Sequence, residues 1–375
     1  MTIQNITKDA MYDAVTPDDF GAMLELDRFG NRSTALDRSI SATDDHYWDP
    51  LDPKYIDFTA PFDLENEPLL PESQVFPLQA EYISNHLKDP KQRTVFINEM
   101  AAWQFSQMLY GEQGALSLSS SLVHVLKDPG AQEYAANQAR EEARHVTAFA
   151  MYIKARWGKP RPVAPSLKAL LTEIIGAPEV YKKIIGMQLV GEGMAMSAYS
   201  TSYIHNRDPL ARKLLQLIMT DEAFHHKFGK IWADRTVPKL DQDELNIVED
   251  WAAHCFQSTV FNIASQSQLG PVFAQFGMDP QLAMQSMQQL TTGEYRRKAM
   301  REPTNIFRAL VKTLLKAGLI TERTRAFYAS FVDLDELNGE SDRMVGDDIA
   351  EEGIKYLHSV NSNSRLDPLV AVAAE

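Results

Sequence analysis

The pattern of apolar and polar positions divides the chain into three parts. Residues 76–336 carry apolar residues at helical spacing, over long stretches with few glycines or prolines, which is typical of α-helices. Residues 1–75 are rich in Asp and Pro and show little helical period, and residues 337–375 begin with a polar stretch. We therefore expect an all-α protein with an extended N-terminal arm packed on a helical domain over 76–336, followed by a polar C-terminal tail.

Short segments rich in Pro, Gly and Asp interrupt the helical pattern and predict turns. They are KDPG at 127–130, GKPRPVAP at 158–165, NRDP at 206–209 and TVPKLD at 236–241. Asp128 and Asp208 each stand directly before a proline, so we expect each to cap the N-terminus of the helix that follows.

The N-terminal arm contains aromatic side chains that need burial against the rest of the protein. The segment DDHYWDPLDPKYIDFTAPFD, residues 44–63, has no helical period but includes Tyr47, Trp48, Tyr55 and Phe58. We expect this segment to pack on the helical domain instead of acting as a free linker.

Two parts of the helical domain share the same landmarks at a constant offset along the sequence. The matching pairs are Gly111/Gly191, Glu112/Glu192, Asp128/Asp208, Glu142/Glu222, Ala143/Ala223 and His145/His225. We interpret them as two copies of one helix–turn–helix unit.

Helix geometry explains the spacing within each copy. The turn at Asp128 lies about midway between Glu112 and Glu142 in the sequence. At the usual rise per residue, the chain climbs roughly 24 Å from Glu112 to the turn and returns roughly 21 Å to Glu142. Glu112 and Glu142 therefore end at similar heights on antiparallel helices, and the same holds for Glu192 and Glu222.

The repeated residues have the chemistry of a metal site. Glu142 with His145, and Glu222 with His225, are three residues apart and so lie on one helix face. Each single glutamate lies on an apolar face, where it is costly unless paired or bound to metal. The neighbours are Phe105, Met108, Leu116 and Ser119 for Glu112, and Leu189, Met196 and Tyr199 for Glu192. One Glu-x-x-His is common on solvated helices, but two copies with two matched glutamates are typical of a di-iron or di-manganese carboxylate centre.

Residues beside these candidates have more than one interpretation. Glu141 and Asp221 precede the paired glutamates and could accept hydrogen bonds from the histidines, or could be surface charges. Glycine inside a helix costs about 1 kcal/mol, so the glycines at 111, 114, 191 and 193 indicate close approach, either of substrate or of another helix. An apolar substrate pocket would be lined by Leu116, Ser119, Met196 and Tyr199, although core packing is the alternative.

Composition excludes several classes of protein. Hydrophobic residues make up 44% and charged residues 23%, as in ordinary globular proteins. No apolar run reaches the length of a membrane span, and the N-terminus lacks a secretory signal. The single Cys255 suits a reducing cytoplasm. The net charge of −14 would repel nucleic acid. We therefore expect a cytoplasmic protein with neither nucleic-acid nor membrane partners.

The motifs EEARH (141–145) and DEAFHH (221–226), each with a single glutamate well upstream (Glu112 and Glu192), resemble those of the ferritin-like di-iron oxygenases. The resemblance covers about 95–235 and is greatest to multicomponent monooxygenase hydroxylases, aryl-CoA epoxidases and arylamine N-oxygenases. It implies a ferritin-like four-helix bundle with additional C-terminal helices. It also implies that one iron is held by Glu112, Glu142 and His145, and the other by Glu192, Glu222 and His225. Glu141 and Asp221 would hydrogen-bond the histidines crosswise between the two helix pairs.

The sequence departs from these families at two positions. Phe224 stands where several hydroxylases have arginine, and Ile218 stands where the arylamine N-oxygenases have a third histidine. His226 follows directly after His225 and so points about 100° away from it, which favours a role other than metal binding.

We therefore expect a non-haem di-iron enzyme, a monooxygenase or oxidase, which uses O2 as co-substrate on a small apolar or aromatic molecule. Two iron ions are expected, with a manganese–iron pair left open. The chain lacks dinucleotide-binding glycines and cysteine clusters, so electrons would come from a separate reductase or ferredoxin. The alternatives are arylamine-type N-oxygenation, iron oxidation and storage as in ferritins or rubrerythrins, and an inactive scaffold subunit. An exposed apolar helix pair would allow a homodimer.

Overall fold

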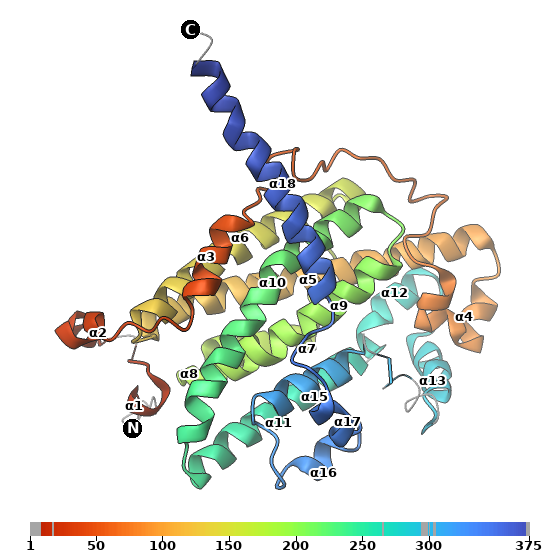
Figure 1. Cartoon of the computed structure of the whole chain (residues 1–375). Coiled ribbons are helices and arrows are strands. Elements are labelled where there is room, and N and C mark those ends of the chain that lie inside the picture. Colours follow the sequence, from red (N-terminus) through yellow and green to blue (C-terminus); the bar gives the residue numbers. More distant parts are fainter. Residues whose placement is uncertain are drawn as a thin grey trace.

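The computed structural model of the protein describes residues 9–16, 19–264, 266–293, 299, 301–302 and 305–372. Over these residues the chain is helical and forms no strand (Figure 1), although one isolated antiparallel bridge joins Ala14 and Leu126. The prediction of an all-α protein is confirmed. No helix in this described part is long and apolar enough to cross a bilayer.

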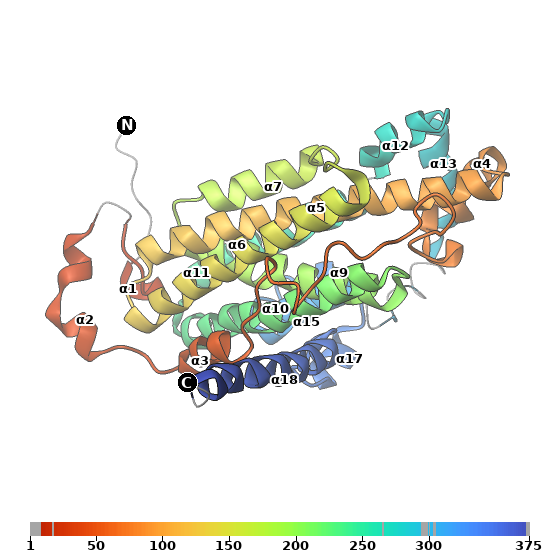
Figure 2. The same cartoon turned by 90° about the horizontal axis from the view of Figure 1, so that it is seen from above.

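Four long helices lie side by side at the centre of the molecule (Figures 1 and 2), and we call them the central helices. They are α5 (Pro90–Val125), α6 (Pro129–Trp157), α9 (Glu192–His205) and α10 (Pro209–Thr236). Short turns join α5 to α6 and α9 to α10, and an aspartate caps each second helix as predicted. Asp128 accepts from the Gly130 amide at 2.9 Å, and Asp208 accepts from the Leu210 amide at 2.9 Å.

The two copies of the repeat differ in the helix that carries the single glutamate. In the first copy α5 continues as one helix through Glu112. In the second copy α8 (Val180–Lys183) leads into a π-helix, η4 (Ile184–Gly191), which ends beside Glu192. Helix α10 approaches η4 closely at Gly229, where a Cβ atom would lie 2.7 Å from the backbone oxygen of Gln188. Such π-helical segments occur often at functional sites.

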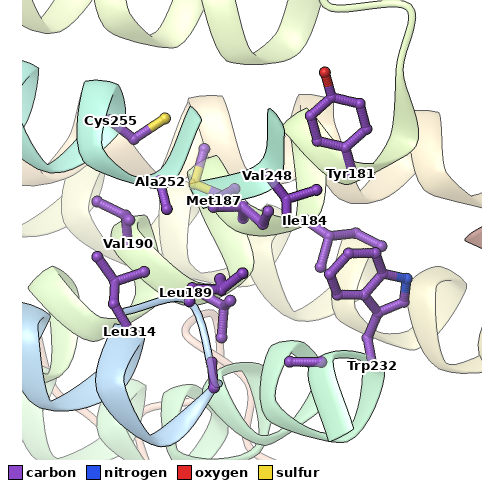
Figure 3. Close-up of a cluster of buried hydrophobic side chains, with 14 of the residues drawn as sticks. Tyr181, Ile184, Met187, Leu189, Val190, Trp232, Val248, Ala252, Cys255 and Leu314 are labelled. Carbon is purple, nitrogen blue, oxygen red and sulfur yellow. The ribbon is translucent and has the colours of Figure 1, made fainter. Parts of the chain in front are cut away.

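The largest hydrophobic core lies where η4 meets α10, α11 (Gln242–Ala264) and α15 (Ile306–Lys316), shown in Figure 3. Met187 and Val190 of η4 lie there beside Ala252 and Cys255 of α11. Cys255 is fully buried and forms no disulfide, and burial raises the pKa of its thiol far above the usual range. It acts as an apolar filler.

The N-terminal arm is less extended than predicted. Its first part forms α1 (Asp9–Tyr12), η1 (Gly21–Leu24), α2 (Leu26–Gly30) and α3 (Asp37–Asp45), and residues 46–71 are irregular. At the start of α3 the Ile40 amide donates a hydrogen bond to the Leu36 carbonyl. Trp48 and Tyr55 are buried, while Tyr47 and Phe58 are partly buried, so the arm packs on the helical domain. Residues 1–8 and 17–18 of the predicted arm lie outside the described residues.

Shorter helices surround the central helices. After the arm come η2 (Glu72–Gln74), η3 (Phe76–Gln79) and α4 (Glu81–His86), and α7 (Pro165–Gly176) follows α6. After α10 come η5 (Val237–Lys239), α11, η6 (Gln266–Leu269), α12 (Gly270–Gln275), α13 (Pro280–Leu290), α15, α16 (Arg325–Tyr328) and α17 (Leu334–Gly339).

The segment predicted as a polar tail instead forms a long helix. This helix, α18 (Asp347–Val372), packs along α10 (Figure 2). Ala350, Gly353 and Leu357 lie three or four residues apart and are buried, so a narrow apolar face makes the contact despite the polar composition. Residues 373–375 of the predicted tail lie outside the described residues.

Candidate metal centre

The six predicted ligands meet in the interior of the central helices. They form two groups whose donor atoms lie within 4.8 Å of one another, and every one of these residues is at most 3% exposed. The first group is Glu112, Glu142, His145 and Glu222, and the second is Glu142, Glu192, Glu222 and His225. Glu142 and Glu222 belong to both groups. The arrangement therefore offers two adjacent four-residue sites with two shared carboxylates.

Both histidines face the carboxylates through Nδ1. Nδ1 of His145 lies 3.2 Å from Glu112 Oε2 and 3.1 Å from Glu222 Oε1. Nδ1 of His225 lies 3.0 Å from Glu142 Oε1 and 3.3 Å from Glu222 Oε2. Nδ1 is therefore the nitrogen that could bind a metal in each case.

The other nitrogen of each histidine contacts an acid from the opposite copy of the repeat. Nε2 of His145 lies 2.8 Å from Asp221 Oδ2, and Nε2 of His225 lies 2.8 Å from Glu141 Oε2. This is the crosswise arrangement that the family resemblance implied. An acid in this position fixes the tautomer and the ring orientation of a ligating imidazole.

Asp221 is also the point where the N-terminal arm reaches the centre. Trp48 donates its indole N–H to Oδ2 of Asp221 at 2.9 Å, and Arg144 donates to the same oxygen at 2.7 Å. Nε2 of His46 lies 3.2 Å from the other oxygen of this carboxylate, Oδ1. The His46 ring also stacks on Phe224, with 5.0 Å between ring centroids. Burial would raise the pKa of Asp221, but Arg144 and the neighbouring imidazoles hold it well below the usual range. Asp221 is thus a fixed negative charge.

Amide and phenol groups hold the carboxylates from the other side. Nε2 of Gln138 donates to Oε1 of Glu142 and to Oε1 of Glu192, each at 3.1 Å. The Gln138 side-chain oxygen accepts from Nε2 of Gln188 at 3.0 Å. Tyr199 donates its phenol O–H to Glu112. Our sequence reasoning missed both glutamines. A signal for Gln138 was present, because it precedes Glu142 by four residues and so shares its helix face.

Without metal, the buried charges balance through protons. Burial and the nearby charge of Glu222 raise the pKa of Glu112 to about 8, and burial raises that of Glu192 still more clearly. Burial would also raise the pKa values of Glu142 and Glu222, but the charge of His225 together with the hydrogen bonds from His145 and His225 lowers both.

The imidazoles are protonated in the same state. Burial would lower their pKa values, but the several carboxylates around each ring, Glu112 foremost for His145 and Glu142 foremost for His225, together raise both well above the usual range. Two charged imidazoles then balance two charged carboxylates, while two further carboxyls stay neutral.

This donor set fits a pair of divalent cations. Among the described residues, Glu112, Glu142 and Glu222 form ion pairs only with His145 or His225. Oε2 of Glu142 is buried and has no hydrogen-bond partner there. Two dications would replace the two imidazole protons and the two carboxyl protons without changing the total charge. Carboxylate oxygen and imidazole nitrogen are donors that suit iron or manganese.

Two further positions singled out in the sequence, His226 and Ile218, lie outside the predicted ligand groups. His226 belongs to neither ligand group, and its buried Nδ1 has no hydrogen-bond partner among the described residues. Burial lowers its pKa to about 4. Ile218 is fully buried in the core between α10 and its neighbours.

A cavity of about 390 Å³ opens onto Glu112, Glu192 and Glu222. Of the predicted pocket residues, Tyr199 lies on its wall, but the structure does not place Leu116, Ser119 or Met196 there. Leu116 is partly exposed, and the Ser119 hydroxyl donates to the Ala115 carbonyl within α5 at 2.8 Å. Met196 is fully buried in a hydrophobic cluster. The cavity wall on α5 instead includes Met108 and Ala115.

The glycines beside the single glutamates have different roles. Three of them allow close packing, because an added Cβ atom would lie too near a neighbouring side chain. The distances are 2.7 Å from Gly114 to Leu171, 2.6 Å from Gly191 to Met187 and 3.2 Å from Gly193 to Thr313. At Gly111, which lies on the cavity wall, a Cβ atom would meet nothing within 4 Å. Gly191 lines the cavity too, but of these four glycines only Gly111 has free space at its Cβ position.

Comparisons with protein-family models, with curated proteins and with solved structures each found no match. The function is therefore inferred from the site itself.

Proposed function

We propose that the chain is a ferritin-like, O2-dependent di-iron oxidoreductase that oxidises a small apolar organic substrate. Glu112 and His145 would serve one iron and Glu192 and His225 the other, while Glu142 and Glu222 would serve both. The observation that carries the proposal is the pair of buried ligand groups with two shared carboxylates, placed at the end of an apolar cavity.

Each part of the centre has a task in this proposal. The metals would supply the redox chemistry and the binding of dioxygen, which protein side chains lack. Asp221 and Glu141 hold His145 and His225 with Nδ1 turned inward. Gln138 holds Glu142 and Glu192, and Tyr199 holds Glu112. The buried surroundings exclude water. Electrons would come from a separate reductase or ferredoxin.

The cavity favours this function over iron storage. A storage protein needs a polar route for hydrated iron, whereas the described wall of this cavity is largely apolar (for example Met108, Leu171 and Met187). Arylamine N-oxygenation is less favoured, because the apolar side chain of Ile218, which is fully buried, occupies the position of the third histidine of that family.

Anaerobic titration with Fe(II) tests the proposal. We expect saturation near two irons per chain, and O2 consumption that depends on this load. Glu142→Gln should abolish binding of the pair, because this carboxylate belongs to both groups. The matched control is Glu99→Gln on α5, where the buried glutamate pairs with Arg161 at 2.6 Å and belongs to neither ligand group.

Two results would overturn the proposal. Absence of metal binding in the folded wild-type protein would contradict it, and uptake far beyond two irons per chain would indicate storage.

A further inference from the structure

We propose that the cavity binds an uncharged, elongated apolar molecule, and that Gly111 provides the space for the part of it nearest the metals. The catalytic meaning of this inference rests on the proposed function, but the binding itself does not require metal.

The length of the cavity follows from the helix that walls it. Residues Met100, Gln104, Met108, Gly111, Glu112 and Ala115 of α5 all line it, and they are spaced three or four apart or are adjacent, as one helix face requires. From Met100 to Ala115 the helix rises roughly 22 Å. Glu112 lies near one end of this stretch. The cavity therefore extends along this face of α5 and reaches the predicted ligands near one end of the stretch.

The opposite walls are also apolar. Leu167, Leu171 and Ile174 come from α7, and Met187, Val190 and Met194 come from η4 and α9. A volume of about 390 Å³ lies within the usual range for a site that takes one small organic molecule. Contact with such walls favours a hydrocarbon chain or ring system.

The ionisable residues on the wall disfavour an anionic substrate. They are Glu112, Glu192 and Glu222, and no Lys, Arg or His occurs among the described residues of the wall. Gln107 cannot serve as an anion site, because its Nε2 donates to the Pro162 carbonyl at 3.1 Å and its Oε1 accepts from the Ala164 amide at 2.8 Å. A carboxylate or phosphate buried beside these glutamates would meet no cationic side chain among the described residues of the wall, which is costly.

Gly111 controls how much of this space reaches the metals. It immediately precedes Glu112, and a side chain at this position would extend into open space on the cavity wall. At the matching position of the second copy, Gly191, the space is already filled by Met187. The open volume beside the centre therefore lies on the α5 side.

Ligand binding is tested by calorimetry on the full-length protein, both metal-free and loaded with Mn(II), using linear primary alcohols and their carboxylates as probes. We expect 1-decanol to bind both forms, and the affinity to rise roughly fourfold per methylene from hexanol to decanol, as burial of a methylene group predicts. Decanoate at pH 8 should bind at least tenfold more weakly than decanol.

Variants locate the binding. Gly111→Leu should weaken decanol binding at least tenfold, because leucine favours the helix but fills the cavity. The matched control, Gly176→Leu, should bind decanol as the wild type does, because Gly176 has nothing within 4 Å of its Cβ position and does not line the cavity. Ala198→Leu fills the cavity from α9 and should also weaken binding, which covers the case in which Gly111→Leu fails to fold.

The outcomes separate this inference from the proposed function. Equal binding of decanol and decanoate, or decanol binding unchanged in both cavity-filling variants, would overturn the inference even if two metals bind. Selective decanol binding by a protein that takes up no metal would overturn the proposed function and leave the inference standing.

Discussion

His145 and Asp221 are 76 residues apart in the sequence, yet Nε2 of the imidazole lies 2.8 Å from Oδ2 of the carboxylate. The first residue belongs to α6 and the second to α10, so the contact joins the two copies of the repeat. The contact between His225 and Glu141 joins the two copies again, with the histidine now from the second copy and the acid from the first. Each predicted ligand histidine is thus oriented by the copy to which it does not belong.

Replacing Asp221 should weaken metal binding more than replacing Glu141. Asp221→Asn removes the charge that orients His145, and loss of such an acid typically lowers metal affinity about 10- to 100-fold. It also leaves the buried Arg144 without its carboxylate, which should destabilise the fold by about 3–5 kcal/mol. Glu141→Gln removes only the contact to His225. Chelator competition and urea unfolding measure the two effects, and equal unfolding free energies in the two variants would contradict the role given to Arg144.

The indole of Trp48 should stabilise the protein through its hydrogen bond to Asp221. Trp48→Phe keeps an aromatic ring but removes the N–H donor, and hydrogen bonds to charged groups contribute about 1.5–3 kcal/mol. The matched control is Trp157→Phe, because the indole N–H of Trp157 is buried without a partner in the described part of the chain. We expect a clearly larger loss of unfolding free energy in the first variant, measured in urea. A comparable loss in both would show that ring volume matters and the hydrogen bond does not.

Metal binding should release protons and strengthen with pH. The pKa of Glu112 is raised to about 8 in the metal-free centre, so below pH 8 a metal must displace the proton of this carboxyl. The pKa shifts of Glu192, His145 and His225 add three further protons. Binding of two dications at pH 7 should therefore release about four protons per chain, one for each of these charge changes.

The direction of the pH effect follows from these protons. Affinity should rise as the pH increases toward 8, and the part due to Glu112 should disappear above it. Calorimetry in buffers of different ionisation enthalpy counts the released protons. Affinity that does not change between pH 6 and 8 would contradict the protonation pattern.

Two glycines should respond in opposite directions to alanine. At Gly229 a Cβ atom would lie 2.7 Å from the Gln188 oxygen and 2.9 Å from Leu189, so Gly229→Ala should push α10 away from η4 and cost roughly 1–3 kcal/mol. At Gly111 a Cβ atom meets nothing within 4 Å, so Gly111→Ala should stabilise the helix by about 0.5–1 kcal/mol. Urea unfolding gives both signs, and two changes of the same sign would contradict the packing described here.

The convergence of the six predicted ligands could be foreseen because much of it rests on local geometry. Three-residue spacing places Glu142 beside His145 in any α-helix, and the constant offset between the two copies repeats the pair without knowledge of the tertiary fold. Burial of Trp48 was predicted, but the contacts that Trp48 and Gln188 make near the centre were not. Their contacts to the centre come from an irregular segment and from a π-helix, and no periodic pattern indicates either.

The position of the cavity was predicted only in part. We expected it to be lined by Leu116, Ser119, Met196 and Tyr199, and of these only Tyr199 lies on its described wall. On α5 the cavity lies around Met108, Gly111 and Ala115, one step around the helix, and on α9 it lies along Ala195 and Tyr199. Which side of a buried helix faces a void depends on the neighbouring side chains, here those of α7 and η4, and the helical period alone does not determine it.

The sharing of Glu142 and Glu222 has a consequence for the chain as a whole. If the polypeptide were cut in the turn between α6 and α7, each fragment would carry three of the six ligands and only one of the two acids that orient them. Neither fragment could complete a site alone, since the histidine of each requires an acid from the other. Binding of the metal pair would then hold the two fragments together, and their association would depend on metal.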